Sequence, residues 1–246
     1  MNIALAAVEE SLAKAWQQFC GDAEGVTIHR GSILDVPCMD LKHRVDSLVG
    51  RQQQCPAGIV GRIIGERMVR QHVPETLWTV SLLDLVAADR VLEIGCGAGR
   101  AVELVAAHVP EGHVTGIDLS RTMVRAASRR NARALRAGRV AVREGDVARL
   151  PFADQTFDKI LSIHTLYFWQ DPTRAMAEIG RVLRPGGLLA LTLSPGKVGA
   201  ADDAGYRAMV EERVIPSMER LRFTTVRIER GPDSRQYKTV AVIGVR

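Results

Sequence analysis

The sequence has no hydrophobic run long enough to cross a membrane. Its longest apolar stretches, such as Leu188–Leu193, fall far short of the roughly 20 residues that a spanning helix needs. The first residues reach Glu9 and Glu10 without a basic residue before them, which does not resemble a secretory signal. We therefore expect a cytoplasmic protein without membrane partners.

Cysteine is also scarce, with four residues at positions 20, 38, 55 and 96. None forms a Cys-x-x-Cys pair, so we expect neither a structural zinc site nor a disulfide framework, and we predict no bound metal. A chain of 246 residues buries most of its unfolded surface without such cross-links. Its 46% hydrophobic and 25% charged residues are typical of a soluble globular domain.

Only five of the 33 basic residues are lysine, and the rest are arginine. The net charge of +5 has two explanations: codon bias in a GC-rich genome, or an acidic partner such as nucleic acid. Arginines gather in one helical stripe, which comprises Arg121, Arg125, Arg129, Arg133 and Arg136. Because the excess charge is modest and aromatic residues make up only 4% of the chain, we interpret the stripe as a solvated face and expect no nucleic-acid partner.

From residue 74 onwards, helix and strand patterns alternate. We expect helices over residues 75–87, 99–109, 121–137, 172–183 and 202–222, and strands over 90–94, 113–119, 140–144, 157–163, 188–193, 225–230 and 239–245. Such alternation predicts a parallel sheet with helices on both faces. The last two strands are joined by a short Gly-Pro-Asp turn, so they form a hairpin that adds an antiparallel strand. Residues 1–73 are less regular, with helices expected over 3–19, 42–51 and 59–71 and an extended segment over 26–34.

The clearest chemical signal is a glycine loop at Val91–Gly99. A hydrophobic strand runs into three alternating glycines and then into a helix, whose N-terminal N–H groups are free to bind a ligand. Asp118 closes the next strand, where an acid can bind both hydroxyls of a ribose. The spacing is G-x-G-x-G, and Arg100 occupies the third small position of a dinucleotide fingerprint. The loop therefore suits a nucleoside joined to an amino acid better than a pyrophosphate, and a tight turn that binds nothing remains the alternative.

Five segments in order resemble the motifs of class I S-adenosylmethionine-dependent methyltransferases. They are Val91–Gly99, Gly116–Ser120 with Met123, Glu144–Val147 with Leu150–Phe152, Phe157–Ile160, and Glu178–Gly187. The resemblance implies an α/β fold with a Rossmann-like, doubly wound, seven-stranded sheet that is mostly parallel with an antiparallel C-terminal hairpin strand. It also implies a methyltransferase core over residues 74–246, preceded by cofactor-covering helices within 1–73. The N-terminal extension would be a substrate lid or a dimer arm, so a homodimer is possible.

The same resemblance implies the site residues. S-adenosyl-L-methionine would be the cofactor and a small molecule the methyl acceptor, at an O, N or C atom. Gly95 and Gly97 would pass beneath the methionine part, Glu93 would organise that end, and Asp118 would bind the ribose. The full set of implied cofactor-binding residues is Glu93, Gly95, Cys96, Gly97, Asp118, Leu119, Met123, Asp146, Val147 and His164.

Two residues after the fourth strand are candidates for catalysis. His164 can take a proton near neutral pH, if the acceptor arrives protonated. Tyr167 can form a wall of the acceptor pocket. Alternatives are that His164 only packs against the cofactor and that Tyr167 belongs to the core. For the whole protein, the alternatives are an RNA methyltransferase, an NAD-dependent oxidoreductase, and a non-catalytic scaffold with a methyltransferase-like fold.

Overall fold

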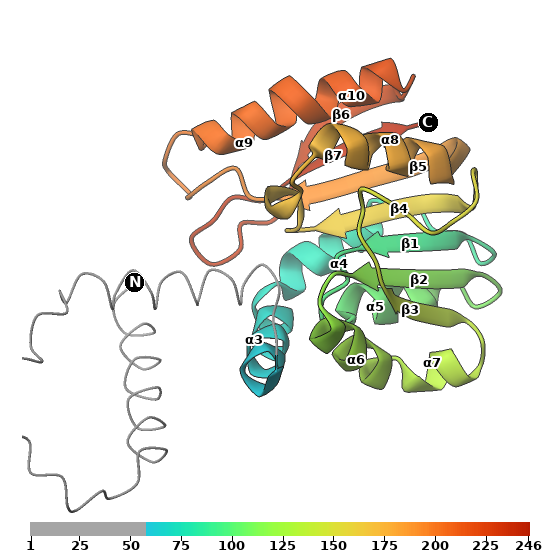
Figure 1. Cartoon of the computed structure of the whole chain (residues 1–246). Helices are drawn as coiled ribbons and strands as arrows, with labels where there is room; N and C mark the ends of the chain where they lie inside the picture. The colour runs from blue at the N-terminus through green and yellow to red at the C-terminus, as the bar shows by residue number, and fades with distance from the viewer. Residues whose placement is uncertain (1–57) are drawn as a thin grey trace, which may run out of the picture. The chain divides into compact units, whose positions relative to one another are not determined.

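The computed structural model describes residues 58–246, without the side chains of residues 59–64. The segments expected over 3–19, 26–34 and 42–51 lie outside the described residues. For the same reason, the division of the chain into 1–73 and 74–246 stays a prediction. Figure 1 shows the described part as a central sheet with helices packed around it.

Within residues 58–246, seven strands form one sheet in the order β3-β2-β1-β4-β5-β7-β6. Their bounds are β1 (Arg90–Ile94), β2 (His113–Asp118), β3 (Val140–Glu144), β4 (Phe157–Ile163), β5 (Leu183–Leu193), β6 (Thr224–Arg230) and β7 (Val240–Val245). Strands β1 to β5 pair in parallel, whereas β7 is antiparallel to both β5 and β6. The predicted fold class is therefore confirmed, including the antiparallel hairpin strand.

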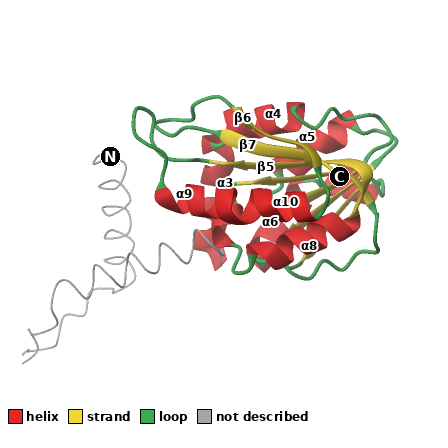
Figure 2. Ribbon diagram, turned by 90° about the horizontal axis from the view of Figure 1, so that it is seen from above, coloured by secondary structure: helices red, strands yellow, loops and turns green. Residues whose placement is uncertain are grey.

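The helices form a layer on each face of the sheet. Their bounds are α3 (Gly58–Gln71), α4 (Val73–Ser81), α5 (Arg100–His108), α6 (Arg121–Arg130), α7 (Ala132–Arg136), α8 (Pro172–Val182), α9 (Ala204–Met209) and α10 (Ile215–Arg220), with a 3₁₀ turn η1 (Leu166–Phe168) and a π-helical turn η2 (Val210–Val214). Figure 2 shows α4 and α5 on the opposite side of the sheet from α8, α9 and α10. Across the described residues, no helix has the length and apolar character needed to span a membrane.

Alternate residues of the central strands fill two hydrophobic cores. On β1, Val91 packs into the core beneath α5, whereas Leu92 packs into the core beneath α8. Both side chains are fully buried, because successive residues of a strand point to opposite faces and helices cover both. Burial on both faces explains why apolar residues occupy consecutive positions of these strands, as Val91 and Leu92 do.

Several element boundaries differ from the sequence-based expectation. The first core helix ends at Ser81 and not near residue 87. The Pro-Gly-Gly segment at 185–187 lies within β5 instead of in a loop. A bulge opposite Phe157–Lys159 accommodates the residues between Leu183 and Leu188, and the carbonyl oxygen of Gly187 accepts from the N–H of Arg246. The helix expected over 202–222 contains the π-helical turn η2, which precedes Pro216, a residue that has no N–H for a regular helical bond.

The helix expected over 121–137 is split at Asn131. Its buried side-chain amide donates hydrogen bonds to the carbonyl oxygens of Gly99 and Ala127, both at 3.0 Å. The first of these bonds reaches across to the end of the glycine loop, where Gly99 caps α5 with a φ of +79°. Asn131 thus connects α6 to the loop that the sequence marked as the ligand site.

Replacing Asn131 by Ala should destabilise the protein by about 1–3 kcal/mol, because the two buried side-chain hydrogen bonds to Gly99 and Ala127 would be lost. Urea unfolding measures this change. Ser128→Ala is a suitable control, since the Ser128 hydroxyl donates only within its own helix, to Val124. We expect that control to change stability by less than about 0.5 kcal/mol. Equal losses in the two variants would contradict the role given to Asn131.

Candidate active site

A cavity of about 380 Å³ opens at the carboxyl ends of the parallel strands. In Figure 1, the arrowheads of β1, β2, β4 and β5 point towards this end of the sheet, where α3 and the start of α4 also lie. Side chains and backbone from the ends of β1, β2, β3 and β4 line the cavity together with α3 and α4. Ligands of open α/β sheets bind at this kind of crevice.

The glycine loop after β1 is held against the end of β2 by Asp118. The N–H of Gly97 donates to Oδ2 of Asp118 at 2.8 Å, and the N–H of Ser120 donates to Oδ1 at 2.8 Å. Burial raises the pKa of Asp118 above its ordinary value, although these two hydrogen bonds act in the opposite direction. The carboxylate still has lone pairs that face the cavity, so it can accept from two further hydroxyls.

Two glycines of the loop are needed for different physical reasons. Gly95 has a φ of +70°, and any Cβ there would overlap the side-chain methyl of Thr165. Gly97 has a φ of +50°, and no atom lies within 4 Å of the place where its Cβ would be. Because Gly97 lines the cavity, its missing side chain leaves space for a ligand beside the backbone. These residues therefore fit the amino-acid end of a nucleoside cofactor.

Glu93, near the end of β1, is buried with a relative exposure of 4%. Burial raises its pKa to about 8, and the nearby charge of Asp118 acts in the same direction, against the hydrogen bond from the N–H of Val102. Its Oε2 atom has no hydrogen-bond partner among the described residues. A protonated, unpaired carboxyl at the cavity wall is available to donate a hydrogen bond to a ligand.

Cys96 lies in the loop, but its thiol faces away from the cavity. The sulfur atom packs against Gly116 of β2, where a Cβ would come within 3.0 Å of it. Burial raises the thiol pKa well above its ordinary value. Cys96 therefore contributes its backbone to the loop and its side chain to the core.

The four residues expected around the adenine all line the cavity. Leu119 is 56% exposed and Val147 is 8% exposed, so they form an outer and an inner wall. Met123 is buried against Gly65 of α3, where a Cβ would come within 2.7 Å of its sulfur. Asp146 is exposed and its Oδ1 accepts from the N–H of Ala148 at 2.9 Å. The structure thus brings these residues together as the sequence motifs imply.

One ion pair ties α3 to the glycine loop. Arg130 of α6 donates to Oε2 of Glu66 at 2.6 Å and, through Nε, to the carbonyl oxygen of Ala98 at 2.8 Å. Together with the contact of Gly65 on Met123, this pair positions α3 beside the cavity. The sequence does not single out Arg130 for this role, because nothing local distinguishes it from the neighbouring arginines of the stripe.

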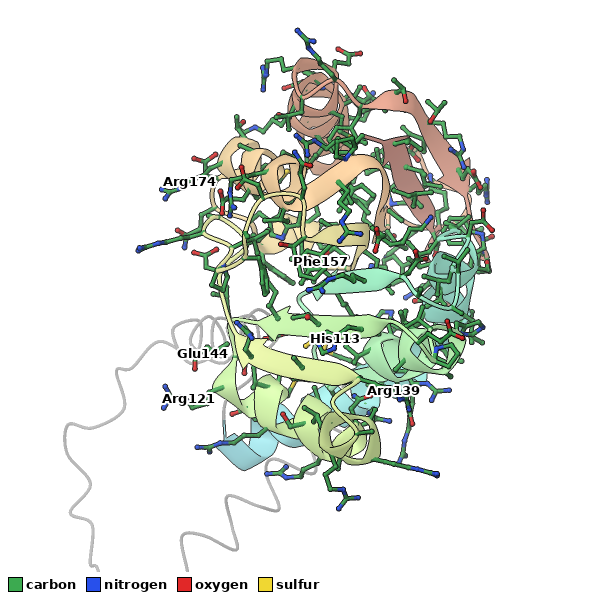
Figure 3. All side chains as sticks on the ribbon, turned by 90° about the vertical axis from the view of Figure 1, so that its right-hand side faces the viewer. His113, Arg121, Arg139, Glu144, Phe157 and Arg174 are labelled. Carbon is green, nitrogen blue, oxygen red and sulfur yellow. The ribbon has the colours of Figure 1, made fainter. Side chains whose placement is uncertain are left out.

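The five arginines of the stripe face solvent. Arg121, Arg125, Arg129, Arg133 and Arg136 are all exposed. Arg121 lies beside Glu144, with 3.1 Å between its Nε and the carboxylate, as Figure 3 shows at the sheet edge. The interpretation of this stripe as a solvated face agrees with their exposure.

His164 follows β4 in a left-handed backbone conformation, with a φ of +56°. This conformation is uncommon for a residue with a side chain, and it is held by a hydrogen bond of 2.8 Å from the His164 N–H to the carbonyl oxygen of Thr192. The imidazole lines the cavity and lies 3.5 Å, from Nε2 to Oε1, from Glu75 of α4. Burial lowers the pKa of His164, although Glu75 opposes this effect.

Glu75 is almost wholly buried, at 1% exposure, and also contacts His72. The distance between Oε1 of Glu75 and Nδ1 of His72 is 2.5 Å. Burial alone would raise the pKa of Glu75, but the adjacent rings of His164 and His72 outweigh it, so the pKa lies well below its ordinary value. Sequence analysis missed both residues; the available signal was the His-x-x-Glu spacing, which places two side chains one helical turn apart.

Tyr167 is not among the residues that line the cavity. Its hydroxyl is hydrogen-bonded to the backbone of Ser194, and its ring is nearly parallel to that of His164, with 6.5 Å between the centroids. Burial raises its pKa to about 12. Phe168 and Trp169, which follow it, line the cavity instead. The catalytic role of Tyr167 stays a prediction.

Comparison with known proteins agrees with this geometry. The sequence model of a protein family described as a methyltransferase domain matches residues 92–191 of this chain. Residues 92–191 of this chain are therefore similar to a methyltransferase domain. The methyltransferase domain from Aquifex aeolicus, a structure described as a SAM-dependent methyltransferase, superimposes on 75% of this chain and 97% of that one, with a TM-score of 0.60 and 21% identity. The cofactor of such domains is S-adenosylmethionine, and the glycine loop and Asp118 of this chain fit it.

Two curated methyltransferases are similar to part of this chain. The uncharacterized methyltransferase YdaC of Bacillus subtilis is 28% identical over 141 residues, which cover 57% of this chain and 76% of YdaC. The 27-O-demethylrifamycin SV methyltransferase of Amycolatopsis mediterranei is 37% identical over 127 residues, which cover 50% of this chain and 46% of that enzyme. The chain spans less than half the length of most of the curated relatives that it matches.

Replacing Glu93 by Gln should change how stability depends on pH. In the folded protein the Glu93 carboxyl has a pKa of about 8, so it keeps its proton up to about that pH. In the unfolded chain the same carboxyl loses its proton near pH 4.5. The folded state thus binds more protons within this window, so the stability that Glu93 contributes falls as pH rises through it and levels off above it. The free energy of unfolding of the wild type, relative to Glu93→Gln, should fall by up to about 1.4 kcal/mol for each pH unit in the window. Denaturant unfolding at several pH values measures this difference, and parallel curves would contradict it.

Proposed function

We propose that this protein transfers the methyl group of S-adenosylmethionine to an O, N or C atom of a small molecule. The observation that carries the proposal is the open space at Gly97 beside the hydrogen bond from Gly97 to Asp118. A loop that only made a tight turn would need neither the space nor a buried carboxylate at its side. At about 380 Å³, the cavity is at the lower end of the range for ligand sites, which favours a small acceptor over RNA.

In this proposal the two sides of the cavity have different tasks. Asp118 binds the ribose hydroxyls, and Gly95 and Gly97 lie beneath the methionine part, with Glu93 donating a hydrogen bond at that end. Leu119 and Met123 lie on either side of the adenine, and Asp146 and the N–H of Val147 bind its edge. These side chains already line one cavity, with the backbone of Cys96 completing the loop.

The acceptor side is formed by the segment that follows β4. S-adenosylmethionine, when bound, supplies an electrophilic methyl group, so the protein mainly has to hold a nucleophile in line with it and exclude water. Phe168 and Trp169 provide an apolar wall, and His164 provides a polar group within reach of the glycine loop. His164 would accept a proton only from an acceptor that arrives protonated. We place Tyr167 behind His164, where its ring supports the imidazole.

Two alternatives make different predictions. An RNA methyltransferase would use the exposed arginine stripe of α6 and α7, and its affinity for RNA would fall steeply with salt. A non-catalytic scaffold would bind the cofactor without turnover of any acceptor. A cytoplasmic location and a homodimer stay predictions.

Gly97→Ala tests the cofactor site against a matched control, Gly138→Ala. Both glycines have positive φ, +50° and +69°, and neither has an atom within 4 Å of its missing Cβ. Both variants should therefore lose a similar amount of stability, about 1 kcal/mol. Only the methyl group at position 97 enters the cavity, so that variant alone should bind S-adenosylhomocysteine at least about tenfold more weakly, a loss of about 1.4 kcal/mol. Calorimetry measures the affinities, and unchanged binding by Gly97→Ala would overturn the proposed site.

A further inference from the structure

Three side chains meet at the acceptor side of the cavity: His72, Glu75 and His164. One ligand atom from each lies within 4.8 Å of the others. His72 precedes α4, Glu75 is in its first turn, and His164 follows β4, so the cluster joins segments about 90 residues apart. Both imidazoles also line the cavity.

Two atoms of this cluster are buried without a hydrogen-bond partner among the described residues. They are Oε2 of Glu75 and Nε2 of His164. Glu75 is 1% exposed, and its other oxygen, Oε1, is the one that contacts His72. A buried carboxylate oxygen without a partner is costly, and such groups in native proteins commonly bind a ligand or an ion.

The surrounding structure fixes these side chains in place. The carbonyl oxygen of Thr192, in β5, accepts a hydrogen bond of 2.8 Å from the N–H of His164. The hydroxyl of Thr192 is hydrogen-bonded to the hydroxyl of Thr79, at 2.7 Å. The hydroxyl of Thr79 in turn lies 2.7 Å from the carbonyl oxygen of Glu75. One buried residue therefore anchors both the helix that carries Glu75 and the backbone of His164, which is the kind of support that a metal site needs.

The chemistry of the three groups is that of a cation site. Two imidazoles and one carboxylate form the protein ligand set of catalytic zinc sites and of non-haem iron sites, which keep open positions for substrate. Around a tetrahedral ion with ligands at 2.0–2.1 Å, the ligand atoms lie roughly 3.3 Å apart. The ligand atoms of the three side chains lie within 4.8 Å of one another, which is close to that spacing. The charges of His72 and Arg235 both act on His164, and Arg235 also contacts the side-chain oxygen of Gln71 at 3.4 Å.

We propose that His72, Glu75 and His164 bind one divalent transition-metal ion, Zn²⁺ or Fe²⁺, with its open positions facing the cavity. The ion would bind an oxygen of the methyl acceptor and hold it beside the glycine loop. Coordination lowers the pKa of a hydroxyl, which then releases its proton to solvent and presents an alkoxide or phenolate oxygen. This use of the ion rests on the proposed methyl transfer, whereas binding of the ion does not.

The test is titration of the chelator-treated full chain with Co²⁺, followed by absorption spectroscopy, and competition by Zn²⁺. We expect one Co²⁺ per chain, with the visible bands of a nitrogen and oxygen ligand set. Glu75→Gln and His164→Gln should bind at least about a hundredfold more weakly, because each removes a ligand. His113→Gln is the control, since His113 begins β2 at the other end of the strands and its ring contacts Gly138 instead. That variant should bind like the wild type.

Three results are distinguishable. Saturation by one ion that is lost in the two ligand variants, but not in the control, supports the site. No Co²⁺ or Zn²⁺ binding by a wild-type sample that binds S-adenosylhomocysteine would overturn the metal site and leave a hydrogen-bonded His–Glu–His cluster, with the proposed function intact. Metal binding by a sample that binds no adenosyl cofactor would support the metal site and overturn the proposed function. Circular dichroism of each variant shows that lost binding is not lost folding.

Discussion

The hydrogen bond from Gly97 to Asp118 is the interaction on which the site depends. It joins the loop after β1 to the end of β2, two strands that already pair in parallel. A carboxylate at this depth is expensive to bury, and two backbone N–H groups offset part of that cost. The bond can form only because Gly97 adopts a positive φ that brings its N–H to face Asp118. The cofactor half of the cavity is therefore built by backbone conformation more than by side-chain chemistry.

The two halves of the cavity are supported by separate anchors. Asn131 and Arg130 of the α6 region hold the end of the glycine loop through Gly99 and Ala98, and Arg130 also holds Glu66 of α3. On the acceptor side, Thr192 holds both α4 and His164. Because these anchors share no residue, a substitution on one side should leave the other side in place.

The sequence predicted those features that depend on local pattern. Strands β1 and β4 lie at the predicted bounds, since a short, largely apolar run between turn residues is sufficient to define a buried parallel strand. The cofactor side was predictable as well, because the glycines and Asp118 belong to contiguous motifs.

The break in the helix at Asn131 could not be predicted from the sequence, since it depends on a hydrogen bond to the carbonyl oxygen of Gly99, 32 residues away. The cluster of His72, Glu75 and His164 was also missed, because the first two residues lie outside the motifs and meet the third only in the folded chain. Tyr167 was expected to form a wall of the pocket because of its position after β4; its hydroxyl is hydrogen-bonded to the backbone of Ser194, and that role stays a prediction.

The central claim is that this cavity binds an adenosyl cofactor and not a dinucleotide. Calorimetric titration of the wild-type protein with S-adenosylmethionine, S-adenosylhomocysteine and NAD in parallel tests it most directly. We expect one site per chain for each of the first two ligands and no heat of binding for NAD. Binding of NAD, or binding of none of the three, would contradict it.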